Sequence, residues 1–88
     1  MDDHQEQESW EQYVQLLGSR LRQTRQKKGL SQENVAKMAN ISTYTYRKLE
    51  AGQSNPGSPA NPRLRTLAVL AKVLGTSMSR LLNDETTD

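Results

Sequence analysis

The side chains best suited to bind another molecule gather in one short stretch near the middle of the chain. Ser42, Thr43 and Tyr44 carry hydroxyl groups, and Arg47 and Lys48 carry positive charges shortly after them. Hydroxyl, guanidinium and ammonium groups donate hydrogen bonds, and the two cations also attract negative charge. This stretch is therefore the first candidate for a binding surface, and its chemistry suits a polar, negatively charged partner.

Catalytic chemistry has few candidate residues in this chain. His4 is the only histidine and there is no cysteine, which excludes disulfides and thiolate metal sites. Between residues 12 and 82 the only carboxylates are Glu33 and Glu50. These residues cannot supply an acid–base pair, an activated nucleophile or a cluster of metal ligands. We therefore expect a protein that is not an enzyme and that uses no cofactor or metal.

The net charge of +2 hides an uneven distribution. Residues 1–11 carry a charge of −5, residues 12–82 a charge of +10, and residues 83–88 a charge of −3. A basic middle of this strength favours a polyanionic partner. The alternative is an ordinary solvated surface.

Two short helices are expected to position the cluster of hydroxyl and basic residues. Ser31 is a good N-cap for the first helix, which should run to about Ala39. Asn40 suits a tight corner because it tolerates a left-handed backbone. Ser42 then caps the second helix, and Gly52 ends it in the left-handed conformation.

Apolar residues at helical spacing predict which faces are buried. In the second short helix, Tyr46 and Leu49 lie on the inner face, and the Tyr46 hydroxyl is expected to reach an edge of the core. The other predicted core residues are Trp10, Val14, Leu17, Leu21, Val35, Ala36, Met38, Ala39, Ile41, Leu64, Leu67, Leu70, Ala71 and Leu74.

The length of 88 residues indicates one small domain, expected over residues 9–82. Residues 1–8 and 83–88 are acidic and without periodicity, so we expect disordered tails. All three prolines fall in or just after segment 53–61, which predicts a long irregular loop.

Further local signals mark the remaining helices. The capping box SWEQ opens a first helix with Ser9 as its N-cap, and Gly18 within it would permit close packing of a neighbouring helix. Asn61 and Pro62 provide an N-cap and a first-turn proline for a fourth helix, and Ser77 caps a short fifth one. Two alternatives are open for the early apolar residues, which fold back on the core or pair with a second subunit: Trp10, Tyr13 and Leu16.

Three segments of the chain resemble a known family. In order along the sequence they are LGSRLRQTRQKKGLSQENVA, ISTYTYRKLEAG and PRLRTLAVLAKVLGTSMSRLL. Together they make residues 17–82 similar to the lambda-repressor and Cro-like helix-turn-helix family, also called the XRE type. The resemblance implies an all-α, five-helix DNA-binding domain whose second and third helices form the helix-turn-helix. Segment 53–61 departs from the family because it is longer than the usual connection.

The resemblance gives the first cluster a specific role, because the N-terminal part of a recognition helix enters the major groove. Lys48 is expected to bond guanine O6 and N7, and Thr43 or Tyr44 to contact a thymine methyl group. Stacking of Tyr44 on a base is the alternative. The residues expected to contact bases are Ser42, Thr43, Tyr44, Arg47 and Lys48.

Phosphate contacts are expected around the same surface. Gln32 matches a position at which the family's glutamine contacts a phosphate, together with the N-terminus of the second helix. Gln53 and Ser54 follow the recognition helix, where the family places phosphate-binding amides. Charge alone adds three residues, for which a purely solvated role stays open: Arg22, Lys27 and Lys28.

The resemblance also implies one structural ion pair. In the family, an arginine before the glycine that ends the first helix bonds a glutamate near the end of the third helix. Arg25 and Glu50 occupy these positions. A bidentate contact between them would tie the first helix to the recognition helix.

These expectations favour a sequence-specific transcription regulator, in particular a repressor that binds an inverted repeat in double-stranded DNA as a homodimer. One alternative is an antitoxin that binds a small toxin protein as well as its own operator. The other is a protein-interaction adaptor without DNA binding, against which Arg47 and Lys48 argue. Because no apolar run reaches membrane length, we expect no membrane contact. We expect a cytoplasmic protein of bacterial, phage or plasmid type, associated with the nucleoid when bound to DNA.

Overall fold

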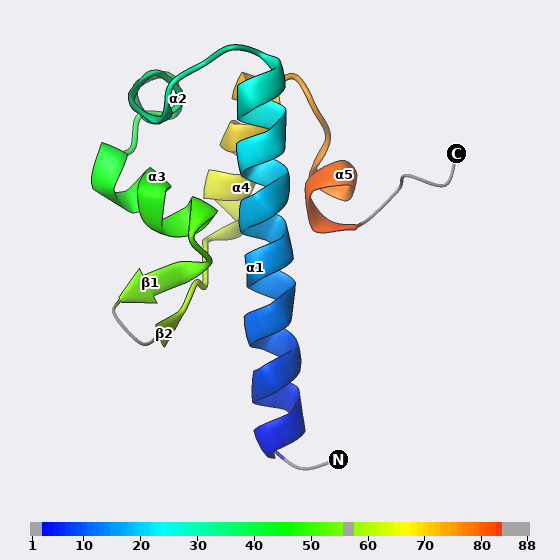
Figure 1. Ribbon diagram of the computed structural model, residues 1–88. Coiled ribbons are helices and arrows are strands. Elements are labelled where there is room, and N and C mark those ends of the chain that lie inside the picture. Colours follow the sequence, from blue (N-terminus) through cyan, green and yellow to red (C-terminus); the bar gives the residue numbers. More distant parts are fainter. Residues whose placement is uncertain (1–2, 56–57, 84–88) are drawn as a thin grey trace.

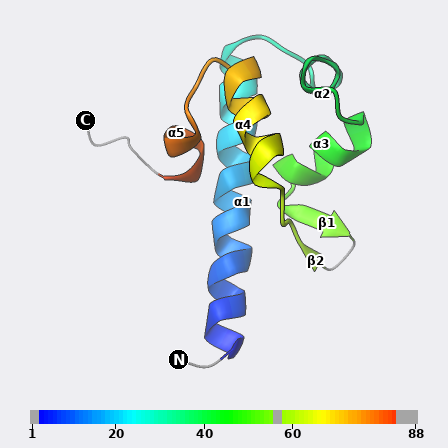
Figure 2. The ribbon, with the colours of Figure 1, turned by 180° about the vertical axis from the view of Figure 1, so that it is seen from behind.

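One long helix runs through the structure, and the shorter elements pack along it (Figure 1). The computed structural model describes residues 3–55 and 58–83. The elements are α1 (Asp3–Lys27), α2 (Gln32–Ala39), α3 (Thr43–Glu50), β1 (Gln53–Asn55), β2 (Ser58–Pro59), α4 (Leu64–Val73) and α5 (Met78–Leu82). Helices α2 and α3 and the strands lie on one flank of α1, and α5 lies on the other. Figure 2 shows α4 in front of α1, on the face hidden in Figure 1.

Helix α1 begins at Asp3, so the N-cap predicted at Ser9 is wrong. The segment that was expected to be a disordered tail is helical from Asp3 onward. An acidic sequence is compatible with this start, because negative charge is favourable near the N-terminus of a helix. The parts of the two predicted tails at residues 1–2 and 84–88 lie outside the described residues. No helix in the described part of the chain is both long enough and apolar enough to cross a membrane.

Gly18 allows α1 and α3 to meet at close range. A Cβ atom at this position would lie 2.7 Å from the carbonyl oxygen of Leu49, and closer still to that of Glu50. The C-terminal end of α3 therefore rests on the backbone of α1. The predicted role of Gly18 in close helix packing is confirmed.

The α2–α3 unit follows its predicted local signals. Ser31 and Ser42 each accept a hydrogen bond at 3.0 Å from the backbone N–H group three residues further on. Asn40 adopts φ 61° and ψ 41° at the corner, and Gly52 has φ 73° after the end of α3. Both N-caps, the corner and the C-terminal glycine are confirmed.

The core forms where α1, α2, α3, α4 and α5 meet, with Tyr46 fully buried at its centre. Three predicted core residues are wrong, since the side chains of Trp10, Met38 and Leu64 are 40%, 56% and 70% exposed. Met38 lies on a flank of α2 that no neighbouring helix covers, and Leu64 is the first residue of α4. The buried apolar residues are Val14, Leu17, Leu21, Val35, Ala36, Ala39, Tyr46, Leu49, Ala60, Leu67, Leu70, Ala71, Leu74 and Leu81.

The segment predicted to be an irregular loop forms a small antiparallel hairpin instead. Strand β1 pairs with β2, with Gln53 opposite Pro59 and an irregular register after that pair. Ala60 N then donates a hydrogen bond to the Gly52 carbonyl at 2.9 Å, which closes the base of the hairpin at the end of α3. The turn-forming residues of the segment indicate that the chain reverses its direction. The pairing of β1 with β2, however, depends on the hydrogen bond between Ala60 and Gly52.

Helix α4 begins later than predicted. Its N-cap is Arg63, which has φ −72° and ψ 147° and makes no side-chain capping bond. The N-cap predicted at Asn61 and the first-turn position predicted for Pro62 are therefore wrong, because the chain stays extended until it leaves the hairpin. Ser77 caps α5 as predicted, accepting a hydrogen bond from Arg80 N at 3.1 Å.

Trp10 and Tyr13 attach the N-terminal half of α1 to the rest of the domain. Trp10 Nε1 donates to the Ala60 carbonyl at 3.0 Å, and Tyr13 Oη donates to the Leu82 carbonyl at 2.8 Å. Their rings stack with centroids 5.8 Å apart and planes inclined by 9°. These bonds fold the two residues back onto the domain, but both side chains stay exposed and outside the core. Both rings and Leu16 keep exposed surface, so pairing with a second subunit stays a prediction.

Candidate nucleic-acid interface

The outer face of α3 brings together most of the residues that were predicted to contact bases. Tyr44 is 66% exposed and Arg47 is also exposed. Thr43 and Lys48 are partly buried beside them. Lys48 Nζ lies 4.8 Å from the centre of the Tyr44 ring, so attraction to the ring face favours one position for the ammonium group.

Ser42 has a structural task at the start of this face. Its Oγ accepts a hydrogen bond from Thr45 N at 3.0 Å and donates one to Thr45 Oγ1 at 2.8 Å. The hydroxyl hydrogen is therefore already used within α3. Ser42 is exposed, but its remaining capacity for an outside partner is that of an acceptor.

The inner end of α3 is joined to α1 by Arg25 and Glu50. Arg25 Nε donates to Glu50 Oε2 at 2.6 Å, and Arg25 Nη2 donates to Glu50 Oε1 at 3.1 Å. Arg25 Nη1 also donates to the Leu30 carbonyl at 3.0 Å, in the connection between α1 and α2. The two side chains are only 13% and 4% exposed, so this is a largely buried bidentate pair. The structure thus brings together the two residues that the resemblance paired.

Two further residues extend this pair, and sequence reasoning did not connect them. Gln32 Nε2, at the start of α2, donates to Glu50 Oε1 at 2.9 Å. Arg47 Nε donates to Gln32 Oε1 at 3.2 Å. A continuous set of side-chain hydrogen bonds therefore runs from α1 through the end of α3 and the start of α2 to the outer face of α3. Sequence spacing gives no signal for a contact between Gln32 and Arg47, because they lie on different helices.

The pKa values at this junction reflect burial and hydrogen bonding. Burial alone would raise the pKa of Glu50, but the hydrogen bonds from Arg25 and Gln32 outweigh it, and the pKa is lowered. The hydrogen bond with Glu50 raises the pKa of Arg25. Burial, and then the neighbouring carboxylate, raise the pKa of the Tyr46 hydroxyl. This hydroxyl is buried beside the Arg25–Glu50 pair, without a well-formed hydrogen bond to a described residue.

A shallow groove of about 170 Å³ separates α3 from the hairpin and the chain that leads into α4. Tyr44 and Lys48 line it from α3, and Gln53 and Ser54 line it from β1. The structure therefore places the two predicted phosphate-contacting residues of the hairpin beside the predicted base-contacting ones. Asn61 lines the same groove and is exposed, although the sequence signal assigned it to a helix cap.

The basic residues near the end of α1 are less closely associated with this face. Arg22, Lys27 and Lys28 are all exposed. Lys28 Nζ lies so close to Gly75 that a side-chain carbon there would collide with it. Its ammonium group is thus near the C-terminal end of α4, where positive charge is favourable. None of the contacts seen in residues 3–55 and 58–83 joins Arg22 or Lys27 to α3.

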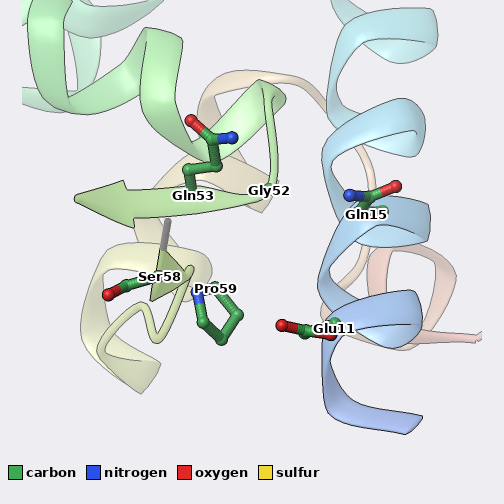
Figure 3. A pocket seen from close by; sticks show the side chains of 6 residues that line it. All are labelled: Glu11, Gln15, Gly52, Gln53, Ser58 and Pro59. Carbon is green, nitrogen blue, oxygen red and sulfur yellow. The ribbon is translucent and has the colours of Figure 1, made fainter. Parts of the chain in front are cut away.

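A second hollow of about 250 Å³ lies between α1 and the hairpin (Figure 3). Glu11 and Gln15 line it from α1, and Gly52, Gln53 and Ser58 line it with Pro59 from the hairpin side. Among the described residues that line it, Glu11 carries the one titratable group.

Comparison with known proteins identifies the fold family. The family described as "Helix-turn-helix domain" matches residues 16–82, which include α2 through α5 and residues 16–27 of α1. The chain belongs to the helix-turn-helix family, of the XRE-like type.

This chain is also similar to an SPbeta prophage-derived uncharacterized HTH-type transcriptional regulator, YonR, of Bacillus subtilis (strain 168). The two are 37% identical over 67 residues, which cover 76% of this chain and 56% of the relative. The chain thus spans little more than half the length of that helix-turn-helix protein.

Proposed function

We propose that this protein binds double-stranded DNA through a helix-turn-helix formed by α2 and α3, within a five-helix domain of the lambda-repressor type. The observation that carries the proposal is the outer face of α3. It presents Tyr44, Arg47 and Lys48, while the inner face of the same helix is buried against α1 and α2. A firmly held helix with exposed donors and cations suits the major groove. Membership of the helix-turn-helix family supports this reading.

We assign base contacts to Thr43, Tyr44, Arg47 and Lys48, with Ser42 acting at the margin as an acceptor. The groove supports a second set of contacts, because Gln53 and Ser54 lie beside Tyr44 and Lys48. Their amide and hydroxyl groups can donate to phosphate oxygens on the strand that passes α3. The remaining proposed phosphate contacts are those of Arg22, Lys27 and Lys28, whereas both ends of the Gln32 amide are already hydrogen-bonded within the protein.

We further propose that the protein is a transcriptional repressor and that it acts as a homodimer. One α3 helix contacts few base pairs, so sequence specificity requires two half-sites about one helical turn apart in an inverted repeat. A dimer that covers such a repeat would compete with RNA polymerase for the same DNA. The description of the Bacillus relative as a prophage-derived transcriptional regulator supports the regulatory part of this proposal, and we propose that the protein acts in the cytoplasm of a bacterium.

Selection of bound sequences from a random duplex pool tests the proposal. The selected duplex is then titrated against a scrambled duplex at two salt concentrations. We expect a palindromic sequence bound at least ~10³-fold more tightly than the scrambled one. The logarithm of the binding constant should fall with the logarithm of the salt concentration by about 0.9 per phosphate contact, so this slope gives the number of phosphates that the protein contacts. Absence of any enriched sequence would overturn the proposal and favour the protein-interaction adaptor.

The same titration tests the assignment of Lys48. Lys48→Ala should reduce the preference for the selected duplex about tenfold by weakening binding to that duplex, because a lysine–guanine contact distinguishes bases. Lys72→Ala is the matched control, since Lys72 is an exposed lysine on α4. Equal losses on selected and scrambled DNA would show that Lys48 contacts the backbone instead.

A further inference from the structure

We propose that Gln32 is a positioning residue that orients the guanidinium of Arg47 toward DNA. It does so because its amide bonds both Arg47 and Glu50, and Glu50 is itself held by Arg25. This inference rests on the proposed DNA binding and adds to it, because it makes the binding of Arg47 to DNA depend on the side-chain amide of a residue in a different helix. It also differs from the role that the family resemblance implies for Gln32, which is a direct phosphate contact.

The orientation of the Gln32 amide is determined by its two neighbours. Its Nε2 donates to Glu50 Oε1 at 2.9 Å, and its Oε1 accepts from Arg47 Nε at 3.2 Å. The reversed orientation would place the amide oxygen against a carboxylate and the NH₂ group against a guanidinium, so both contacts would become repulsive. The Gln32 amide therefore bridges the carboxylate of Glu50 and the guanidinium of Arg47.

The position of Glu50, to which the Gln32 amide is bonded, is itself well fixed. Its two oxygens already accept two hydrogen bonds from Arg25, and the side chain is only 4% exposed. Buried, charge-assisted bonds of this kind are short and directional. Because the negative charge is already balanced by Arg25, Glu50 holds Gln32 without competing with DNA for the charge of Arg47.

Arg47 is held by one edge only. Among the described residues, the hydrogen bonds of its guanidinium are made by Nε, to Gln32. The terminal Nη1 and Nη2 groups make no hydrogen bond within that part of the protein, and the residue is exposed. Two parallel N–H donors on a planar group match a phosphate or the O6 and N7 atoms of guanine. Holding the Nε edge limits the directions in which this fork can point, which lowers the entropy lost on binding.

A double-mutant cycle separates positioning from direct contact. Gln32→Met keeps the length of the side chain and removes both hydrogen bonds, and Arg47→Ala removes the group that is positioned. If Gln32 acts through Arg47, Gln32→Met should weaken binding to the selected duplex about 5–10-fold in the wild-type background, because an arginine side chain that is not held loses more conformational entropy on binding. It should have less than about a twofold effect in the Arg47→Ala background. Gln23→Met, at an exposed position on α1, is the control for the glutamine-to-methionine change.

A measurement on the free protein makes the test independent of DNA. Hydrogen exchange of the Arg47 Nε–H group, followed by NMR in uniformly labelled protein, should accelerate in Gln32→Met and stay unchanged in Gln23→Met. Equal losses from Gln32→Met in both arginine backgrounds would overturn the proposal and establish a direct phosphate contact. Unchanged exchange at Arg47 Nε would overturn it as well. Failure of the wild-type protein to prefer any duplex would instead overturn the proposed function, while the exchange data would still report whether the Gln32–Arg47 bond forms.

Discussion

Helix α3 is held on two sides by different kinds of contact. Toward α1 and α2, side chains hold it through the ion pair of Arg25 with Glu50 and the amide of Gln32. Toward the hairpin, backbone groups hold it, through strand pairing and the bond from Ala60 N to the Gly52 carbonyl. The first side depends on side-chain identity at each position. The second depends on the path of the chain, so it should tolerate more changes of sequence.

The largest effect is expected from a substitution that disrupts the close contact between α1 and α3 at Gly18. Gly18→Ala should lower the free energy of unfolding by about 3 kcal/mol, because the new methyl group collides with backbone carbonyl oxygens of α3 that cannot move independently. Gly29→Ala is the control, since that position has φ 70° but open space around it, and only backbone strain of about 1 kcal/mol is expected. Urea unfolding followed by circular dichroism gives both values. Equal losses would mean that α3 does not rest on α1 at Gly18.

The next effect leaves the shape intact and removes the charge. Glu50→Gln should destabilise the protein by about 2–3 kcal/mol, because Arg25 would stay largely buried without its counter-charge. Glu33→Gln, at an exposed position of α2, should change the unfolding free energy by less than about 0.5 kcal/mol. A loss for Glu50→Gln no larger than that of the control would show that the pair contributes orientation alone.

The same pair predicts how stability depends on pH. Because the pKa of Glu50 is lower in the folded protein than the unfolded value of about 4.3, its contribution is fully present above that value. The contribution is lost as the pH falls through the folded-state pKa. The unfolding free energy of wild-type protein should therefore fall more steeply between about pH 5 and pH 3 than that of Glu50→Gln. Parallel acid profiles for the two proteins would contradict this assignment.

The smallest effect concerns the hairpin side. Trp10→Phe removes the hydrogen bond to the Ala60 carbonyl and keeps an aromatic ring, so a loss of about 1 kcal/mol is expected. Amide hydrogen exchange should accelerate at Ala60 and stay unchanged in α2, because the contact is local. Tyr13→Phe, which removes the neighbouring bond to Leu82, is the matched control and should leave exchange at Ala60 unchanged. Acceleration throughout α2 would show that the two sides of α3 are coupled.

Local signals explain why the α2–α3 unit could be predicted from the sequence. Ser31, Asn40, Ser42 and Gly52 act through their own or nearby backbone groups, so residue type and position suffice. The meeting of Arg25 with Glu50 was reached through family resemblance, because nothing in the spacing of two distant residues specifies it.

The errors have a different physical origin. Met38 and Leu64 have the right spacing for a core, but exposure depends on where neighbouring helices end. The hairpin after α3 depends on closure by Ala60, and that closure also delays the start of α4. The bond between Gln32 and Arg47 requires α2 and α3 to be placed side by side first. Each missed feature is thus a product of tertiary structure rather than of a local preference.

The position of the chain's single tryptophan has an optical consequence. Trp10 stacks on Tyr13 and bonds the carbonyl at the base of the hairpin, so its fluorescence reports on one junction of the molecule without any added label. Its emission should shift to longer wavelength when the N-terminal half of α1 detaches, even if the α2–α3 unit stays folded. A DNA titration followed by tryptophan fluorescence would therefore reveal whether binding of DNA to α3 changes the surroundings of Trp10 in the N-terminal half of α1.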